Sequence, residues 1–170
     1  VFIVISGDVL TDIDLTKAIQ FHKNRQAVAT IILTRIKNPL PFGVVITNSE
    51  GKITRFLEKP SWGQVFSDTI NTGIYILEPT IFNYIPNKTF FDFSKDLFPL
   101  LLKENVPLYG YIAEGYWKDV GDLNEYQKAN FDCLHKKVKL KFPGKIYKDN
   151  VWIGEHCEIA DNVEFQGPVI

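Results

Sequence analysis

The sequence predicts an α/β fold, an open sheet with helices packed on it, followed by the first coils of a parallel β-helix. Three observations support this. Apolar runs of strand length alternate with segments whose apolar residues recur at helical spacing, the pattern of a sheet covered by helices. Acidic motifs follow two of these runs, where open α/β sheets bind ligands. From Pro143 onward the apolar period changes to six residues, which is typical of a β-helix.

The first elements are expected to form a right-handed βαβ unit. Val1–Ile5 consists of consecutive apolar residues, which predicts a strand buried on both faces. Asp14 should cap an amphipathic helix that reaches about Asn24, and Val28–Thr34 is the next apolar strand. Because the chain begins inside a strand and contains no methionine, we expect it to be an internal piece of a longer protein.

The remaining elements of the sheet domain follow from the same periodicities and from turn residues. They are a hairpin of strands 42–47 and 52–59 around the turn 48–51, a strand at 71–77, a short helix at 78–84, a helix at 93–104, a strand at 108–112 and a helix at 123–134. We place a domain boundary near residue 140, with the sheet domain over 1–140 and a β-helix domain over 141–170.

The six-residue period predicts which side chains fill the core of the second domain. The core positions are Val151, Cys157, Val163 and Val169, with Ile153, Ile159 and Phe165 each two places later. Small or β-branched residues suit a narrow interior, so Cys157 is expected to be a buried structural thiol. A solenoid buries its core by stacking coils, so we expect further coils beyond Ile170 and a homo-oligomer formed through this domain.

The composition is that of a globular protein, with 45% hydrophobic residues, 23% charged residues and a net charge of −1. The longest apolar stretches are shorter than the roughly 20 residues of a membrane span, and no signal segment opens the chain, so a cytoplasmic location is expected. The basic run Lys136–Lys141 has no interleaved aromatic residues, which argues against nucleic-acid binding. His22, His135 and His156 share no metal-ligand spacing.

Two acidic motifs lie far apart along the chain. Ser6–Asp8 follows the first apolar run, and Tyr116–Asp122 follows the strand expected at 108–112. If Asp8 and Asp119 converge in a cleft about 4 Å apart, they repel by roughly 4 kcal/mol at an effective dielectric of about 20. A divalent cation removes that cost. The alternative is that both aspartates cap the helices that follow them.

Three further motifs have residues suited to binding a substrate. Glu58–Pro60 ends a strand, its proline restricts the backbone, and its lysine is a suitable point charge for a phosphate. Asn71–Gly73 opens an apolar strand with polar groups, and Gly43 within a strand indicates close approach of another group. The alternatives are an exposed charge pair before a turn, an ordinary strand start and a β-bulge.

Six motifs follow one another along the chain. They are S-G-D (6–8), F-G-V-V (42–45), F-L-E-K-P (56–60), N-T-G-I-Y (71–75), F-D-F-S-K-D-L-F-P-L-L (91–101) and G-Y-W-K-D-V-G-D (115–122). Their order resembles the nucleotide-sugar pyrophosphorylases and, with the hexads, most resembles the mannose-1-phosphate guanylyltransferases that carry a C-terminal left-handed β-helix. The resemblance implies a partial Rossmann-like mixed sheet of a nucleotidyltransferase domain, followed by the start of a left-handed parallel β-helix.

The resemblance also implies roles for individual residues. Asp8 and Asp119 would hold Mg²⁺, the implied cofactor, and Lys59 would contact the phosphate of a sugar 1-phosphate, so these three form the implied catalytic set. The implied substrate-binding residues are Gly43, Glu58, Lys59, Asn71 and Gly73, of which Glu58 and Asn71 would hydrogen-bond sugar hydroxyls. The family's glycine-rich G-x-G-T-R-L loop and P-K-P segment are absent from the sequence, so we expect this chain to be inactive alone.

The implied reaction is in-line attack of a sugar-phosphate oxygen on the α-phosphorus of a nucleoside triphosphate, with release of pyrophosphate. The first candidate is the formation of GDP-mannose from mannose 1-phosphate and GTP. One alternative is a glucose-1-phosphate nucleotidyltransferase that uses UTP or dTTP. The other is a non-catalytic relative that acts as a regulatory or interaction subunit.

Overall fold

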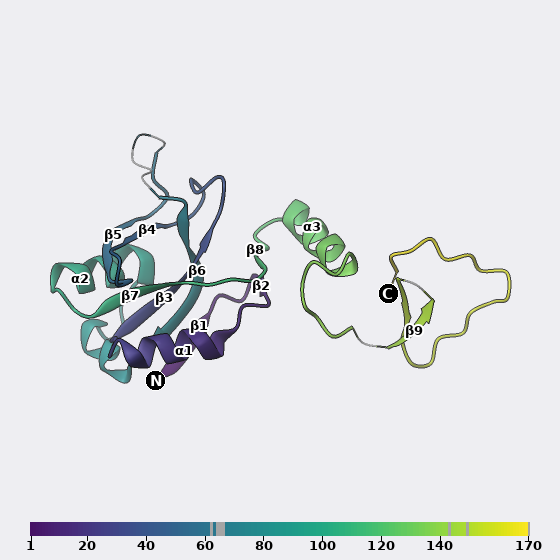
Figure 1. Ribbon diagram of the computed structural model, residues 1–170, viewed down its shortest axis with the longest axis horizontal. Coiled ribbons are helices and arrows are strands. Elements are labelled where there is room, and N and C mark those ends of the chain that lie inside the picture. Colours follow the sequence, from purple (N-terminus) through teal and green to yellow (C-terminus); the bar gives the residue numbers. More distant parts are fainter. Residues whose placement is uncertain (62, 64–66, 143, 149, 170) are drawn as a thin grey trace.

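Six strands of the computed structural model form one mixed sheet, and the model describes residues 1–61, 63, 67–142, 144–148 and 150–169. The strands are β1 (Phe2–Ile5), β3 (Ala29–Arg35), β4 (Val44–Thr47), β5 (Ile53–Leu57), β6 (Thr69–Leu77) and β7 (Leu108–Ile112), ordered β5-β4-β6-β3-β7 with β1 also paired to β6. β6 pairs antiparallel with β1, β3 and β4, whereas β3 pairs parallel with β7. The predicted α/β mixed sheet is confirmed (Figure 1).

Helices cover both faces of this sheet. Helix α1 (Leu15–Asn24) packs on β3, β6 and β7, and α2 (Phe98–Lys103) packs on β5 and β7. Side chains of a strand alternate between faces, so Ile31 and Leu33 enter the core beneath α2 while Ile32 enters the core beneath α1. None of the helices formed by the described residues is long and apolar enough to cross a membrane.

The helices begin where capping side chains predict. The Asp14 carboxylate accepts the Thr16 N–H at 2.9 Å, and α1 spans the predicted residues. Pro79–Tyr84 is a 3₁₀ helix, η2, in the predicted place. The single helix predicted over 93–104 is instead a π-helical turn, η3 (Phe93–Leu97), followed by α2. Pro99 has no amide hydrogen for the regular pattern, which accounts for the break.

The prediction that Val1–Ile5 is buried on both faces is wrong. Val1, Ile3 and Ile5 are 52%, 37% and 46% exposed, because α1 covers β3, β6 and β7 and leaves this face of β1 open. Since β1 and β3 are both antiparallel to β6, they run in the same direction, as a βαβ unit requires. β6 lies between them, so the two strands are not neighbours.

A bulge interrupts β6 at its polar segment. Asn71 pairs with Leu33 and Tyr75 pairs with Ile31, so residues 72–74 lie opposite Ile32 alone. Gly73 has a φ of +74°, a conformation that glycine adopts without strain. The polar residues predicted to open the strand therefore lie inside it, at a bulge that redirects their side chains.

A small second sheet lies beside the first. It pairs β2 (Val9–Thr11) antiparallel with β8 (Trp117–Asp119) and leads into α3 (Leu123–Leu134). The Asp122 carboxylate caps α3 by accepting the Glu125 N–H at 2.8 Å. The predicted limits of this helix and of β7 are both confirmed.

After α3 the chain extends away from the main sheet (Figure 1). Here β9 (Lys145–Lys148) and β10 (Val151–Ile153) pair antiparallel, and one parallel bridge joins Val151 to Val169. Val151 is buried, but Val163 and Cys157 are exposed, so the burial predicted for Cys157 is wrong. Within the described residues no second coil covers these positions. The β-helix and the boundary near residue 140 stay predictions.

We expect Phe98→Ala to lower the free energy of unfolding by about 3–5 kcal/mol. Phe98 is fully buried and its ring contacts those of Phe56, Tyr75 and Phe93 at centroid distances of 5.6, 5.1 and 6.1 Å. Phe90→Ala is the matched control, because Phe90 is 92% exposed and its loss should change stability by no more than about 0.5 kcal/mol. Equal losses in urea unfolding would contradict the described core.

Candidate active site

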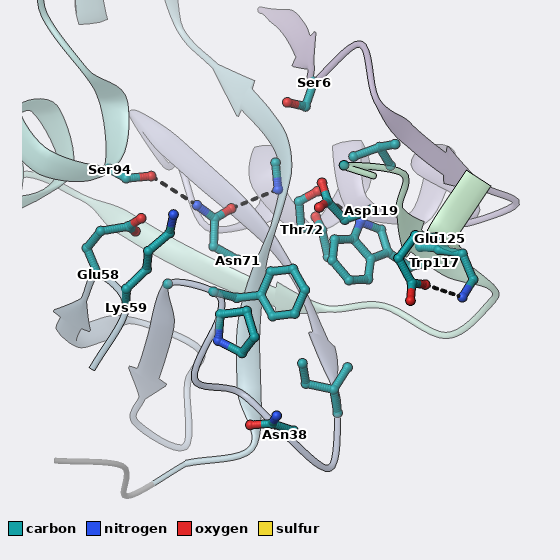
Figure 2. Close-up of a pocket in the computed structure, with 18 of the residues that line it drawn as sticks. Ser6, Asn38, Glu58, Lys59, Asn71, Thr72, Ser94, Trp117, Asp119 and Glu125 are labelled. Atoms are coloured by element: carbon teal, nitrogen blue, oxygen red, sulfur yellow. Dashed lines mark hydrogen bonds and ion pairs between the residues drawn. The ribbon is translucent and has the colours of Figure 1, made fainter. Parts of the chain in front are cut away.

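A cavity of about 710 Å³ opens where the bulge of β6, the end of β5 and strand β8 meet. Figure 2 shows Glu58, Lys59 and Asn71 on one side of it and Trp117, Asp119 and Glu125 on the other. Of the residues predicted to bind substrate or metal, all but Asp8 line this cavity: Gly43, Glu58, Lys59, Asn71, Gly73 and Asp119.

Asp8 lies next to the Asp119 segment but does not line the cavity. Val9 pairs directly with Asp119, and the Val120 N–H donates to the Asp8 carbonyl at 2.8 Å. The Asp8 side chain is exposed and does not line the cavity. The β2–β8 pairing nevertheless holds its carboxylate close enough to act on Asp119 through its charge.

The pKa of Asp119 shows how the two aspartates interact. Partial burial raises the pKa of this carboxyl above its ordinary 3.8, and the neighbouring Asp8 carboxylate raises it further. The Lys59 ammonium acts in the opposite direction, which places a cation within electrostatic reach as well. The carboxylates that cap helices in the described residues are Asp14, Asp92 and Asp122, so the capping alternative is not supported for Asp8 and Asp119.

This donor set fits a magnesium ion. Two carboxylates raise each other's energy when ionised, and a divalent cation relieves that repulsion. In the part of the chain that the structure describes, no group of three or more His, Cys, Asp or Glu side chains converges on one point. Mg²⁺ does not require one, since it is commonly held by one or two carboxylates together with waters and substrate phosphates.

Glu58 and Lys59 lie directly after β5, as predicted. Burial raises the pKa of the Glu58 carboxyl, and Asp92 adds to the rise while Lys59 opposes it. Lys59 has a φ of +44°, in the left-handed region that lysine seldom adopts, and a buried Pro60 follows it. Uncommon backbone conformations of this kind concentrate at binding sites, where the surrounding structure imposes them.

Gly43 precedes β4 rather than lying within a strand. A Cβ atom there would lie 2.9 Å from Glu58 Oε2 and 3.0 Å from Phe56 Cζ. The close approach predicted at this glycine is therefore made by the Glu58 carboxylate, and any larger residue would displace it.

The bulge of β6 presents an ordered amide to the cavity. Asn71 Oδ1 accepts the Gly73 N–H at 3.0 Å, and its Nδ2 donates to the hydroxyls of Tyr75 and Ser94 at 3.1 and 3.3 Å. These bonds, two of which Figure 2 draws, fix the orientation of Asn71. Ser94 comes from η3 and was not predicted as a site residue, although it lies in the motif 91–101 that contributes to the family resemblance.

The opposite wall is aromatic, which the residue pattern alone did not indicate. Trp117 Nε1 donates to the Thr72 carbonyl at 2.9 Å, and the Phe42 ring meets the indole edge-on at 5.4 Å. Trp117 thus ties β8 to the bulge of β6. The cavity combines this apolar wall with the Lys59 ammonium, the Asn71 amide and the Asp119 carboxylate, which suits a polar ring that carries a phosphate.

The chain is similar to several known proteins. A family model for nucleotidyl transferases matches residues 1–136. The chain is 38% identical to a UTP–glucose-1-phosphate uridylyltransferase of Synechocystis, covering 99% of this chain and 44% of that protein. It is 29% identical to a mannose-1-phosphate guanylyltransferase of Mycobacterium tuberculosis, covering 98% and 51%. A glucose-1-phosphate adenylyltransferase of Bacillus subtilis is 32% identical, with 99% and 48% covered. The chain thus spans about half the length of these relatives.

A solved structure resembles the fold over most of the chain. A putative glucose-1-phosphate thymidylyltransferase from Bacillus anthracis, in complex with a sucrose, superposes with a TM-score of 0.67 and 27% identity. The match covers 84% of this chain and 56% of that one.

We expect Asp119→Asn to raise the free energy of unfolding of the metal-free protein at neutral pH. A carboxyl whose pKa is raised by folding is ionised at neutral pH at a cost to the folded state, which asparagine does not incur. The gain should shrink as the pH falls toward 3.8, where the unfolded chain also takes up its proton.

Asp12→Asn provides the control of opposite sign in the same urea titrations. Backbone N–H groups of Lys139 and Tyr116 hold the pKa of the Asp12 carboxyl below 3.8. Its stabilising effect is therefore present above that value and is lost as the pH falls through its folded pKa. Equal pH profiles for the two variants would contradict the described electrostatics.

Proposed function

The chain belongs to the nucleotidyl transferase family, and we propose that the protein in which it occurs transfers a nucleotidyl group to a sugar 1-phosphate. The nucleotide-sugar pyrophosphorylase relationship predicted from six motifs is confirmed. The observation that carries the proposal is the position of Lys59 and Asp119 in one cavity, with the Asp8 charge beside Asp119.

The residues of the cavity would each bind a different part of the substrates. Lys59 would bind the phosphate of the sugar 1-phosphate and offset its repulsion from the triphosphate. Both N–H groups of Asn71 already donate to hydroxyls of the protein, so its Oδ1 atom, like the Glu58 carboxylate, would accept hydrogen bonds from sugar hydroxyls. Asp8 and Asp119 would hold Mg²⁺, which when bound neutralises phosphate charge. The chemistry then needs little proton transfer from the protein, so positioning supplies most of the catalysis.

The proposed reaction balances without any further reactant. An oxygen of the sugar phosphate forms a bond to the α-phosphorus of the nucleoside triphosphate, and the bond from that phosphorus to the bridging oxygen of the β-phosphate breaks. Pyrophosphate leaves with the electron pair of that bond. The phosphate oxygen attacks as an anion, so no general base is required.

Two substrate pairs are the leading candidates. The resemblance of the motifs together with the hexads favours mannose 1-phosphate with GTP, whereas the 38% identity to a uridylyltransferase favours glucose 1-phosphate with UTP. The test is to incubate the natural protein with Mg²⁺ and each pairing of the two sugar phosphates with UTP, dTTP, GTP and ATP. We expect equal amounts of pyrophosphate and nucleotide sugar from one pairing above the others. Release of neither product from any pairing would contradict the proposal and favour a non-catalytic relative.

We expect Asp8→Asn and Asp119→Asn each to reduce turnover by about 100-fold, which is roughly 2.7 kcal/mol of barrier. The double variant should lose little more than either single variant, because a metal misplaced by one change has less to lose from the second. Steady-state kinetics over a range of Mg²⁺ concentrations provides the measurement. Additive losses would mean that the two carboxylates serve separate functions.

Lys59→Ala should act on the other substrate. The KM for the sugar 1-phosphate should rise while triphosphate binding changes little, since the lysine lies across the cavity from Asp119 (Figure 2). A Lys59→Arg variant keeps the charge and is the matched control, which should restore part of the loss. An increase in the KM for the triphosphate alone would contradict the role given to this lysine.

A further inference from the structure

The Asp12 carboxylate joins three segments that are distant in sequence. It follows β2, and its Oδ1 accepts the Tyr116 N–H at 2.6 Å, 104 residues away. Its Oδ2 accepts the Lys139 N–H at 2.8 Å, 127 residues away. Both carboxylate oxygens are thus engaged by backbone groups, one just before β8 and one in the connector after α3.

Tyr116 is held from its other end by Asp132 of α3. The Tyr116 hydroxyl donates to Asp132 Oδ2 at 2.7 Å, and Lys137 Nζ donates to Asp132 Oδ1 at 2.7 Å. Lys118 Nζ also lies 3.7 Å from Asp132. The Asp132 side chain is only 16% exposed, so these charged hydrogen bonds are partly shielded from water.

A glycine makes the Asp12 contact possible. Gly115 has a φ of +129°, and a Cβ atom there would lie 2.8 Å from Asp12 Oδ1. Any side chain at this position would push the carboxylate away from the Tyr116 N–H. Glycine therefore serves here both for its conformation and for the space that it leaves.

These contacts matter because the strand pairing that holds β8 is short. It is three residues long, pairs with one equally short strand, and carries Asp119 as its last residue. Two-stranded sheets are marginally stable by themselves. Besides that pairing, β8 is held by the Trp117 bond to Thr72, the contact of Trp117 with Phe42 and the ion pairs of Lys118 with Glu125 and Asp132. The Tyr116 carbonyl also accepts the Thr11 hydroxyl at 2.8 Å and the Asp12 N–H at 3.2 Å.

We propose that Asp12 and Asp132 are positioning residues that lock Tyr116 at its backbone and at its hydroxyl, and so hold Asp119 in place to bind metal beside Asp8. Connector residues Lys137 and Lys139 complete this Tyr116 lock, so the segment that leads to the hexads forms part of the active site's support. The inference rests on the metal site of the proposed function.

The test uses Mn²⁺ as the probe, because its binding can be followed by electron paramagnetic resonance without substrates or turnover. Asp12→Asn and Asp132→Asn keep the side-chain size in the natural protein and remove the charge. Each should raise the Kd for Mn²⁺ by about tenfold, the lower end of the loss seen when groups that orient metal ligands are removed. The KM for the sugar 1-phosphate should stay unchanged, because Lys59, which follows β5, and Asn71 of β6 lie outside the lock.

Asp14→Asn is the matched control, since Asp14 lies two residues from Asp12 and its carboxylate caps α1 through the Thr16 N–H. It should leave the Kd unchanged. An unchanged Kd in folded Asp12→Asn protein would overturn the lock, as would a rise in the KM for the sugar phosphate that matches the rise in the Kd.

If Asp12→Asn fails to fold, Tyr116→Phe removes only the hydroxyl bond to Asp132 and should give a smaller rise in the Kd. No change in that variant would overturn the lock as well. If the unaltered protein binds no Mn²⁺, the proposed metal site is wrong, and the role of the lock in holding it is wrong with it.

Discussion

The antiparallel pairing of β2 with β8 is the interaction on which the candidate active site depends. Each strand has three residues, yet their pairing places Asp119 opposite Val9 and beside Asp8. The large sheet alone cannot do this, because β8 belongs to a separate sheet. The hydrogen bonds of Asp12, Trp117 and Asp132 supplement this short pairing near the start of β8.

The electrostatic character of the site follows from that pairing. Partial burial and the neighbouring Asp8 carboxylate both raise the pKa of Asp119, and the opposing Lys59 charge reduces the effect. Glu58, on the other wall, has its pKa raised by burial. With this charge arrangement, the proposed cation beside Asp119 and the proposed phosphate beside Lys59 would each meet a group of opposite charge. Such a site suits a reaction that brings two phosphate-bearing substrates together.

Much of the fold could be predicted because its signals are local. The caps at Asp14 and Asp122 and the turn around Asn48 depend on side chains that bond to their own backbone neighbours, and α1, α3 and the β4–β5 hairpin follow from them. The exposure of β1 and of Cys157 could not be predicted, because burial depends on which other elements cover a strand or coil. The break in the predicted 93–104 helix, by contrast, has a local cause, the missing amide hydrogen of Pro99, and could have been predicted.

The site residues also differ in whether local sequence or contacts across the fold determine their positions. Most predicted binding residues line one cavity, because strand ends and bulges collect polar groups at one edge of a sheet. Asp8 stands outside the cavity wall, and the contributions of Ser94, Trp117 and Asp12 emerge only from contacts across the fold. No spacing in the sequence relates Asp12 to Tyr116 or Lys139, since those bonds close over more than a hundred residues.

The proposed metal site is tested most directly by asking whether the charge of Asp8 changes the pKa of Asp119. The measurement is a carbon NMR titration of the Asp119 carboxyl in the metal-free natural protein and in its Asp8→Asn variant. We expect a pKa above 3.8 for Asp119 in the unaltered protein and a lower pKa in the variant. The same pKa in both proteins would contradict the convergence of the two carboxylates, and with it the metal site built on the β2–β8 pairing.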